Sequence, residues 1–387
     1  MNIVDEVLKD FATDRQKEYI EAVNKTGTIM GAARLLNVPR QTVQEGLKKV
    51  KRKAAIQGYS PKHDMTRTVP DGFKVKGVST YYNKDGKPSG QWVKSTADNE
   101  RQAQIIREAF DAMASELPRL EAIAKPLITS DKLCNLYTFT DSHVGMLAWH
   151  KEGGADWDLK IAEDTLVGVF EQMILSTPFA KVGFINQLGD FLHSDGMLPV
   201  TPTSGHVLDQ DGRFSKIVTV ALKVLRRIID LALMRHEQVI VLMAEGNHDM
   251  ASSIWLRVMF KALYENEPRV KVIDSELPYY HYQHGNTMLA FHHGHMAKND
   301  SLPLLFASQF PKVWGNTTKR YCHTGHRHHV EEKEHSGMKV IQHSTLAARD
   351  AYAARGGWMS EREATAITYH TQYGQVARTT ITPEMLE

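Results

Sequence analysis

Residues 182–193 read VGFINQLGDFLH, and residues 238–249 read QVIVLMAEGNHD. Each stretch begins with a short apolar run of strand length and ends in a glycine followed by side chains that can bind a metal ion or a proton. A third apolar run, at 136–140, ends in the same way. Helical patterns near 159–175 and 214–234 lie between these runs. The sequence therefore predicts an α/β fold, a layered sheet with helices outside and a binding crevice at the ends of the strands.

A second set of strands follows a predicted helix at 252–265. Its members are predicted at 281–284, 287–292, 321–324, 339–343, 366–369 and 375–380. We expect residues 339–358 (KVIQHSTLAARDAYAARGGW) only to complete the sheet. A polar loop follows each of five predicted strands. The key residues of these loops are Asp141 and His143; Asp190 and His193; Asn247, His248 and Asp249; His292, His293 and His295; and His326 and His328.

These loops carry the residue types of a metal site. Of the 19 histidines, 18 lie between His143 and His370, and neutral imidazole is the commonest metal ligand in proteins. Imidazole and carboxylate without thiolate suit Mn²⁺, Fe²⁺ or Zn²⁺ rather than a cysteine-bound structural zinc. In Asp-x-His and His-x-His, alternation would point both side chains to one side of an extended segment. The neutral Asn247 would leave the site positively charged for a phosphate.

Composition narrows the class of protein. The chain has 387 residues, 42% of them apolar and 24% charged, which is typical of a globular protein with two or three domains. Two cysteines argue against a disulfide framework. No apolar run reaches the roughly 20 residues of a membrane-spanning helix, and the N-terminus does not resemble a signal peptide. Neither nucleotide-binding glycine motif is present. We expect a cytoplasmic protein with no membrane partner.

The N-terminal residues predict three helices, at 15–24, 29–36 and 41–55. Between residues 34 and 53 there are seven basic residues and one acidic residue, which suits a polyanionic partner. The segment at 27–53 resembles a helix-turn-helix, with an alanine pair, a turn and a basic recognition helix. Its expected DNA contacts are Arg40, Gln41, Thr42, Lys48, Lys49, Lys51 and Arg52. The alternative is a small three-helix bundle that contacts protein.

The predicted division of the chain has three parts. Residues 1–58 form the helix-turn-helix domain, 59–130 a linker, and 131–387 the catalytic domain. Within the linker we predict a hairpin, 74–82 against 90–94, and a helix at 97–124.

The ordered loops resemble the calcineurin-like metallophosphoesterases, whose pattern is D-x-H, G-D, G-N-H-[DE], a histidine beside glycine, and G-H-x-H. The resemblance covers residues 133 to about 345. It implies a β-sandwich flanked by helices and two divalent metal ions, Mn²⁺ first, with Fe²⁺, Zn²⁺ or Mg²⁺ as alternatives. The first ion would be held by Asp141, His143, Asp190 and His328. The second would be held by Asp190, Asn247, His293 and His326, with His292 and His295 as alternatives to His293.

The resemblance also implies catalytic roles. Two metal ions would generate a bridging hydroxide and clamp the phosphoryl oxygens. His248 would stabilise the transition state or protonate the leaving oxygen, with Asp249 orienting its ring. The spacing G-D-x-x-H places His193 as in the SbcD-type DNA repair nucleases, where this histidine presents a phosphodiester. An ordinary loop histidine is the alternative.

The expected function is a DNA exonuclease or endonuclease. Unlike SbcD-type proteins, the chain has its first motif far from the N-terminus and only 59 residues after His328, with no capping domain. Duplex DNA would therefore be bound by residues 1–58 and by an insertion at 194–215. This insertion is either a mobile segment beside the site or a plain surface loop. A homodimer is possible, and the architecture suits a phage. The alternatives are a phosphatase or cyclic-nucleotide phosphodiesterase, and a DNA-binding regulator without catalysis.

Overall fold

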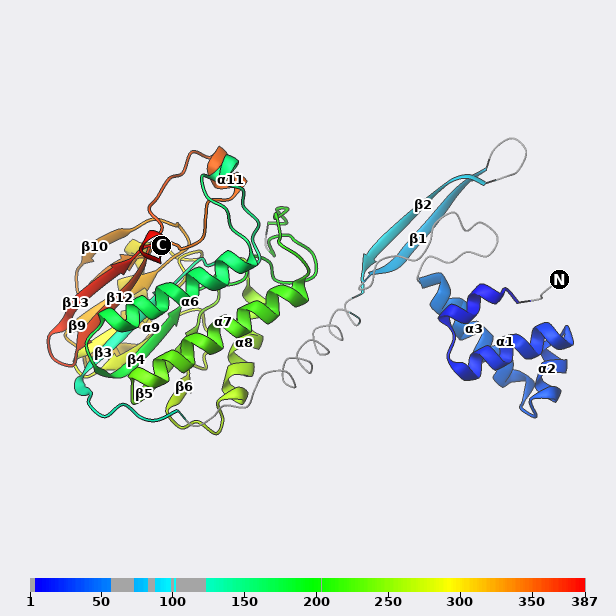
Figure 1. Cartoon of the computed structure of the whole chain (residues 1–387), viewed down its shortest axis with the longest axis horizontal. Coiled ribbons are helices and arrows are strands. Elements are labelled where there is room, and N and C mark those ends of the chain that lie inside the picture. The colour runs from blue at the N-terminus through cyan, green and yellow to red at the C-terminus, as the bar shows by residue number, and fades with distance from the viewer. Residues whose placement is uncertain are drawn as a thin grey trace. The chain divides into compact units, whose positions relative to one another are not determined.

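The computed structural model describes residues 4–56, 73–82, 88–98, 101, 123–202 and 204–386. The chain forms two compact units, Met1–Ala112 and Met113–Glu387 (Figure 1). Nearly all of the helix predicted at 97–124 lies outside the described residues, and the three-part division of the chain stays a prediction.

The N-terminal unit contains the three predicted helices. The 3₁₀ turn η1 (Glu6–Phe11) precedes α1 (Asp14–Thr26), α2 (Ile29–Leu35) and α3 (Arg40–Ile56). Gly27 ends α1 in the left-handed conformation, and the Thr28 hydroxyl accepts a hydrogen bond from the amide of Gly31 at the start of α2.

Helix α3 separates its apolar and basic residues. Its buried residues are Val43, Leu47, Val50 and Ala54, which join the core formed with α1, α2 and η1. Gly46 allows α3 to approach α1 closely, because a Cβ there would lie 2.6 Å from the Tyr19 ring. The seven residues expected to contact DNA are all exposed. The predicted hairpin is also present, with β1 (Phe73–Tyr82) antiparallel to β2 (Pro88–Ala97).

The C-terminal unit contains a six-stranded sheet. Its strand order is β13 (Gly374–Ile381), β12 (Ala364–His370), β3 (Ser130–Phe139), β4 (Ala180–Gln187), β5 (Gln238–Met243) and β6 (Val270–Val272). The last four strands are parallel, so β3, β4 and β5 end at the same edge.

A five-stranded sheet packs against the first. Its order is β10 (Glu331–His335), β11 (Met338–Gln342), β9 (Lys319–Thr324), β8 (Thr287–Phe291) and β7 (Tyr280–His284). Strands β8, β9 and β11 are parallel. One apolar core joins the facing sides of both sheets, with Phe184 of β4 stacked on Phe291 of β8 at a centroid distance of 4.8 Å.

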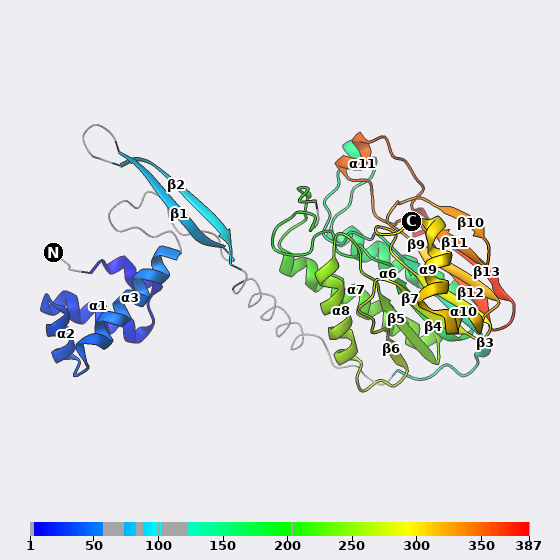
Figure 2. The same ribbon diagram turned by 180° about the vertical axis from the view of Figure 1, so that it is seen from behind.

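Helices cover both outer faces. Helices α6 (Leu159–Ser176), α7 (Phe214–Arg235) and α8 (Met250–Leu263) pack on the six-stranded sheet (Figure 1). Helices α9 (Leu302–Gln309) and α10 (Pro311–Gly315) lie beside the five-stranded sheet (Figure 2). This arrangement confirms the predicted α/β sandwich flanked by helices. Among the described helices, none is both long and apolar enough to cross a membrane.

Several short elements had not been predicted. Strand β6 has three residues, and β10 (EEKEH) is an edge strand with no apolar alternation. The helical segments α5 (His150–Gly153), α11 (Ala351–Arg355), η2 (Asn299–Ser301) and η3 (Pro383–Leu386) have three to five residues each. Elements this short offer too few positions for a hydrophobic period to be recognised.

Candidate metal centre and its cavity

The candidate ligands lie in the loops that leave the carboxyl ends of five strands, as predicted. Five of them have a left-handed backbone, which is uncommon outside glycine. They are Asp141 (φ 51°), His143 (44°), Asp190 (50°), His326 (69°) and His328 (55°). In the rest of the described chain, only Asn37 among non-glycine residues has a positive φ. The expectation of extended Asp-x-His and His-x-His segments is therefore wrong, because each pair lies beyond the end of its strand, in a tight loop.

One cluster contains Asp141, His143 and His328. Asp141 Oδ1 lies 3.0 Å from His328 Nε2, and the Nε2 atoms of His143 and His328 are 3.3 Å apart. Thr140 Oγ1 and the amide of His326 both donate to Asp141 Oδ2. These two donors fix the carboxylate, so Oδ1 faces the imidazoles.

A second cluster contains Asp190, His293 and His326. His293 Nε2 lies 3.2 Å from Asp190 Oδ2 and 3.9 Å from Asp141 Oδ1, so the two clusters adjoin. Asn247 Oδ1 is buried and has no hydrogen-bond donor among the described residues. Asn247 lines the same cavity as Asp190 and His326, and the next amide, that of His248, donates to Asp190 Oδ1. A buried oxygen without a donor in such a loop is what a divalent ion would satisfy. The donor set therefore fits a metal centre.

The structure also separates the three neighbouring histidines after β8. His293 Nδ1 donates to the Leu188 carbonyl at 2.9 Å, which turns Nε2 toward Asp190. His292 is fully buried and stacks on Tyr279, with ring centroids 4.8 Å apart. The ring of His295 stacks on His292 and is turned toward Glu245. Of the three, only His293 lies in a cluster with Asp190.

Opposite charges stabilise each other in this centre. Burial alone would raise the pKa of Asp141 and of Asp190. The imidazoles of His328 and His293 instead lower the pKa of Asp141, and chiefly that of His293 lowers the pKa of Asp190, both below the ordinary range. Burial alone would lower the pKa of His293, but the carboxylates of Asp190 and Asp141 raise it to about 10. The carboxylates are therefore ionised and ready to bind cations.

Two aspartates hold the loops after β4 and β5 together. Asp249 accepts hydrogen bonds from the amides of Asp190, Phe191, Leu192 and Gly246, at 2.7–3.2 Å. In return, Asp195 accepts from the amides of Ala251 and Ser252, both at 2.7 Å, at the start of α8. We call this pair of contacts the aspartate clamp.

The aspartate clamp contradicts the expected role of Asp249 and lies beside the required glycine Gly246. Asp249 was expected to orient the His248 ring, but its carboxylate turns back to the backbone of the other loop. Burial and the Asp190 carboxylate raise the pKa of Asp249. Gly246 is required because a Cβ there would lie 2.1 Å from Asp190 Oδ1.

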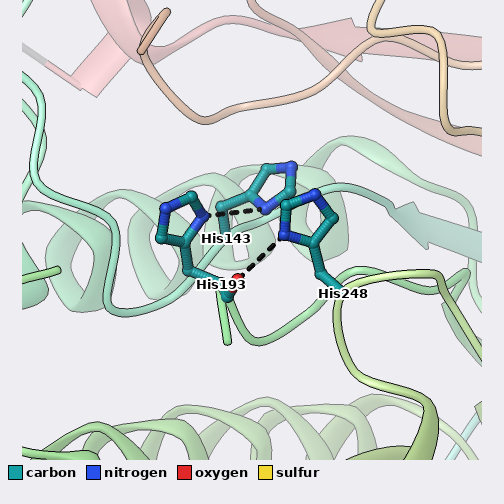
Figure 3. Close-up of side chains that lie close together, drawn as sticks. All are labelled: His143, His193 and His248. Carbon is teal, nitrogen blue, oxygen red and sulfur yellow. Dashed lines mark hydrogen bonds between the residues drawn. The ribbon is translucent and has the colours of Figure 1, made fainter. Parts of the chain in front are cut away.

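The catalytic histidine candidates form a third group, His143, His193 and His248 (Figure 3). His248 Nδ1 donates to the His193 carbonyl at 2.8 Å, and the His248 amide donates to Asp190 Oδ1 at 2.8 Å. The Nδ1 atoms of His193 and His143 are 3.3 Å apart. Burial, with a smaller effect of His248, lowers the pKa of His193 to about 3, so its ring is neutral.

A cavity of about 800 Å³ opens over this centre. Seven of its lining residues come from the predicted site: His143, Asp190, His193, Asn247, His248, His326 and His328. Its other wall is built mainly from residues 345–362, which we call the lip and which includes α11. The expectation that residues 339–358 only complete the sheet is therefore wrong beyond β11. The glycine pair Gly356-Gly357, followed by Trp358, was the available signal for a loop here.

The insertion at 194–215 folds onto itself. Its hydrogen bonds include Ser194 Oγ to Gln210 Oε1, and a β-bridge pairs Val200 with Val207. Among its described residues none lines the cavity. It contacts the lip instead, because the His206 ring lies 6.4 Å from the Tyr352 ring.

No family model matches the chain, and no curated protein matches its sequence. Several solved structures are similar. A predicted phosphoesterase from Streptococcus pneumoniae is 11% identical, with a TM-score of 0.27, and the match covers 66% of this chain and 92% of that one. The phosphoesterase Yfce from E. coli is 13% identical, with a TM-score of 0.30, covering 63% and 98%. Vps29 from Entamoeba histolytica, complexed with zinc, is 13% identical, with a TM-score of 0.27, covering 65% and 99%. At these values the likeness does not determine what the chain does.

Proposed function

We propose that the chain is a metal-dependent phosphodiesterase that hydrolyses DNA. The observation that carries the proposal is that two adjoining Asp/His clusters and His248 open into one cavity. Carboxylates and imidazoles that converge in this way are the donors of two-metal hydrolytic sites. A reaction that cleaves a phosphodiester needs positive charge for the phosphoryl oxygens and an acid for the leaving oxygen.

The residues divide these tasks. Asp141, His143, Asp190 and His328 would hold one divalent ion, and Asp190, Asn247, His293 and His326 a second. Bound there, such ions supply Lewis acidity and activate water. We expect Mn²⁺ to serve first, with Fe²⁺, Zn²⁺ or Mg²⁺ as alternatives.

His248 is the proposed acid. Its Nδ1 must carry a hydrogen, because the His193 carbonyl that it contacts can only accept one. The other nitrogen, Nε2, is left for the substrate, and as imidazolium it can donate a proton to the leaving oxygen. His193 holds the His248 ring through its own carbonyl and packs beside it, with ring centroids 5.6 Å apart. We therefore assign His193 as a positioning residue for His248.

DNA as the substrate is favoured by the basic helix α3. Its exposed residues Lys48, Lys49, Lys51 and Arg52 take part in none of the ion pairs found among the described residues. Exposed cations along one helix can neutralise phosphates. The helix-turn-helix interpretation of α2 and α3 belongs to this proposal, as does a role in DNA repair.

The test is cleavage of end-labelled single-stranded and duplex DNA by the full-length protein with Mn²⁺. We expect wild type to degrade DNA, chelator to stop the reaction, and His248→Ala to lower the rate by about a hundredfold or more. His150→Ala is the matched control, because this histidine is half-exposed, pairs with Asp156 and does not line the cavity.

The substrates separate the alternatives. If DNA survives while bis(p-nitrophenyl) phosphate is hydrolysed, the metal centre is right and the DNA assignment is wrong. A phosphatase or cyclic-nucleotide phosphodiesterase would then be the better conclusion. If no phosphoester is cleaved with any of the four ions, the catalytic proposal fails.

A further inference from the structure

The cavity over the metal centre is lined by residues that the phosphodiesterase chemistry does not use. The Asp/His clusters form part of its lining, and the lip adds Tyr352, Trp358 and Met359. A volume of about 800 Å³ is much more than a phosphate group needs and is in the range of sites for whole small molecules. A substrate whose phosphate lies at the metal centre would therefore extend toward the lip.

Two large aromatic side chains of the lip face solvent. Tyr352 is 65% exposed and Trp358 is 58% exposed, although both line the cavity. Their ring centroids are 5.3 Å apart, with planes inclined at 67°. Large rings that stay exposed at the mouth of a cavity, in contact with each other, offer flat surfaces to a ligand.

The lip is fastened at its base, so the two rings have defined positions. Arg349 donates to the carbonyls of Gly153 and Trp358, and Asp350 caps the amide of Ala353. Ser360 donates to the carbonyl of His328, one of the candidate ligands, and Ser344, just before the lip, donates to the Glu361 carbonyl at 2.6 Å. The segment that carries Tyr352 and Trp358 is thus held against the loop that carries the candidate ligand His328.

A positive charge in the same cavity also suits a nucleotide. Arg327 lies between His326 and His328, is exposed and lines the cavity. Among the described residues no carboxylate pairs with its guanidinium. Aromatic rings and an exposed arginine in one cavity are the combination that binds single-stranded nucleic acid, the rings stacking on bases and the cation binding the backbone.

We propose that Tyr352 and Trp358 form a stacking subsite for the base next to the phosphate at the metal centre. An aromatic face can stack only on a base that is not already stacked in a duplex, so the subsite selects single-stranded or frayed ends. This inference rests on the proposed function, since it identifies which nucleic acid that site accepts.

The test is calorimetric titration of the full-length protein, as the His248→Ala variant with Mn²⁺, using two unlabelled strands. One is hexathymidylate, and the other is the same backbone with abasic tetrahydrofuran units in place of the nucleosides. We expect the strand with bases to bind about tenfold more tightly or better. Contacts of α3 with phosphates are the same for both strands, so they cancel in the ratio of the two affinities.

The variants assign that ratio to the lip. Tyr352→Ala combined with Trp358→Ala should bring the ratio close to one, while Tyr352→Phe should retain it, because the ring remains. Tyr373→Ala is the matched control, since Tyr373 is 62% exposed, packs on His370 and does not line the cavity. Both lip residues are exposed, so the variants should fold, which circular dichroism checks.

Each outcome has one meaning. The stacking subsite is overturned if the ratio is near one in the His248→Ala protein or survives loss of both rings. It is also overturned if hexathymidylate does not bind measurably. If the ratio depends on the rings but wild type cleaves no phosphoester, the subsite stands and the proposed hydrolysis fails. If wild type cleaves DNA but the rings do not affect the ratio, hydrolysis stands and the subsite fails.

Discussion

The two units of this chain use their polar residues in opposite ways. In the N-terminal unit the described charged residues are on the surface, the core is apolar, and one non-glycine residue, Asn37, has a left-handed backbone. In the C-terminal unit, aspartates and histidines are buried side by side, and five left-handed residues are concentrated in the candidate metal centre.

This difference separates a binding surface from a reaction centre. A surface that binds a polyanion needs exposed cations, which any stable helix can present. A reaction centre needs charged groups held close together away from water, and the fold must tolerate strain and repulsion to keep them there. Four predictions test this contrast, in order of decreasing expected effect.

Removing the carboxylate of Asp190 should have the largest effect. Asp190→Ala should lower hydrolysis about a thousandfold or more and reduce the bound metal, because this side chain belongs to both proposed ion sites. Metal content after dialysis is measured by emission spectrometry, alongside DNA cleavage. Asp156→Ala, at an exposed aspartate paired with His150, is the control and should change neither. Full metal content in Asp190→Ala would contradict the proposed ligand set.

Removing three cations of α3 should weaken DNA binding without affecting the reaction centre. Changing Lys48, Lys49 and Arg52 to Gln should lower duplex affinity about a hundredfold and reduce the slope of log K against log salt by about three. Cleavage of bis(p-nitrophenyl) phosphate should stay unchanged. Lys9→Gln, at a lysine already paired with Glu6 and Glu21, is the control. An unchanged salt slope would favour a protein-contacting bundle over a helix-turn-helix.

Acid should destabilise the C-terminal unit through His236. This buried side chain donates from Nδ1 to the Ala180 carbonyl and accepts from the Tyr137 hydroxyl, and burial lowers its pKa to about 4. In the unfolded chain the pKa is about 6.5, so the unfolded state binds an extra proton between these two values. Stability is therefore present above pH 6.5 and is lost as the pH falls toward 4.

His236 by itself is expected to contribute about 2 kcal/mol to the loss of stability between pH 7.5 and pH 5, measured by urea unfolding as the difference between wild type and a His236 variant. His236→Asn should flatten this part of the pH dependence. Residues 4–56 contain no histidine, so the N-terminal helices supply an internal comparison. Equal acid sensitivity of His236→Asn and wild type would assign the effect to other groups.

The smallest predicted effect concerns backbone strain at His326, where φ is 69°. His326→Gly should be more stable than His326→Ala by about 1 kcal/mol, because glycine accepts the left-handed conformation and alanine does not. At Glu21, exposed on α1, the order should reverse, with Ala more stable than Gly by about 1 kcal/mol. Thermal unfolding of the four variants checks both signs, and the same order at both positions would contradict the strain.

The strands and the loop motifs could be predicted from the sequence because both depend on residues that are neighbours in the chain. An apolar run followed by Gly189-Asp190 or Gly246-Asn247 predicts a strand and a polar loop whatever the rest of the chain does. The helices of the N-terminal unit were predictable for the same reason, from the period of Val43, Leu47 and Val50.

The remaining features depend on contacts between distant segments. The lip contacts Gly153 through Arg349, almost 200 residues away in the chain, so no local pattern of residues 345–362 indicates a cavity wall. The choice among His292, His293 and His295 depends on the Leu188 carbonyl. The direction of the Asp249 carboxylate depends on the β4 loop, which a local interpretation of Asn247-His248-Asp249 does not include.

The aspartate clamp has a consequence for the history of the sequence. Asp195 and Asp249 lie 54 positions apart, yet each fixes the loop that carries the other. Loss of either would shift Asp190 and Asn247 relative to each other without changing the identity of any ligand residue. In chains that share this ancestry we therefore expect the two aspartates to covary, and lineages that keep all seven ligands but lose one aspartate should be drifting away from catalysis.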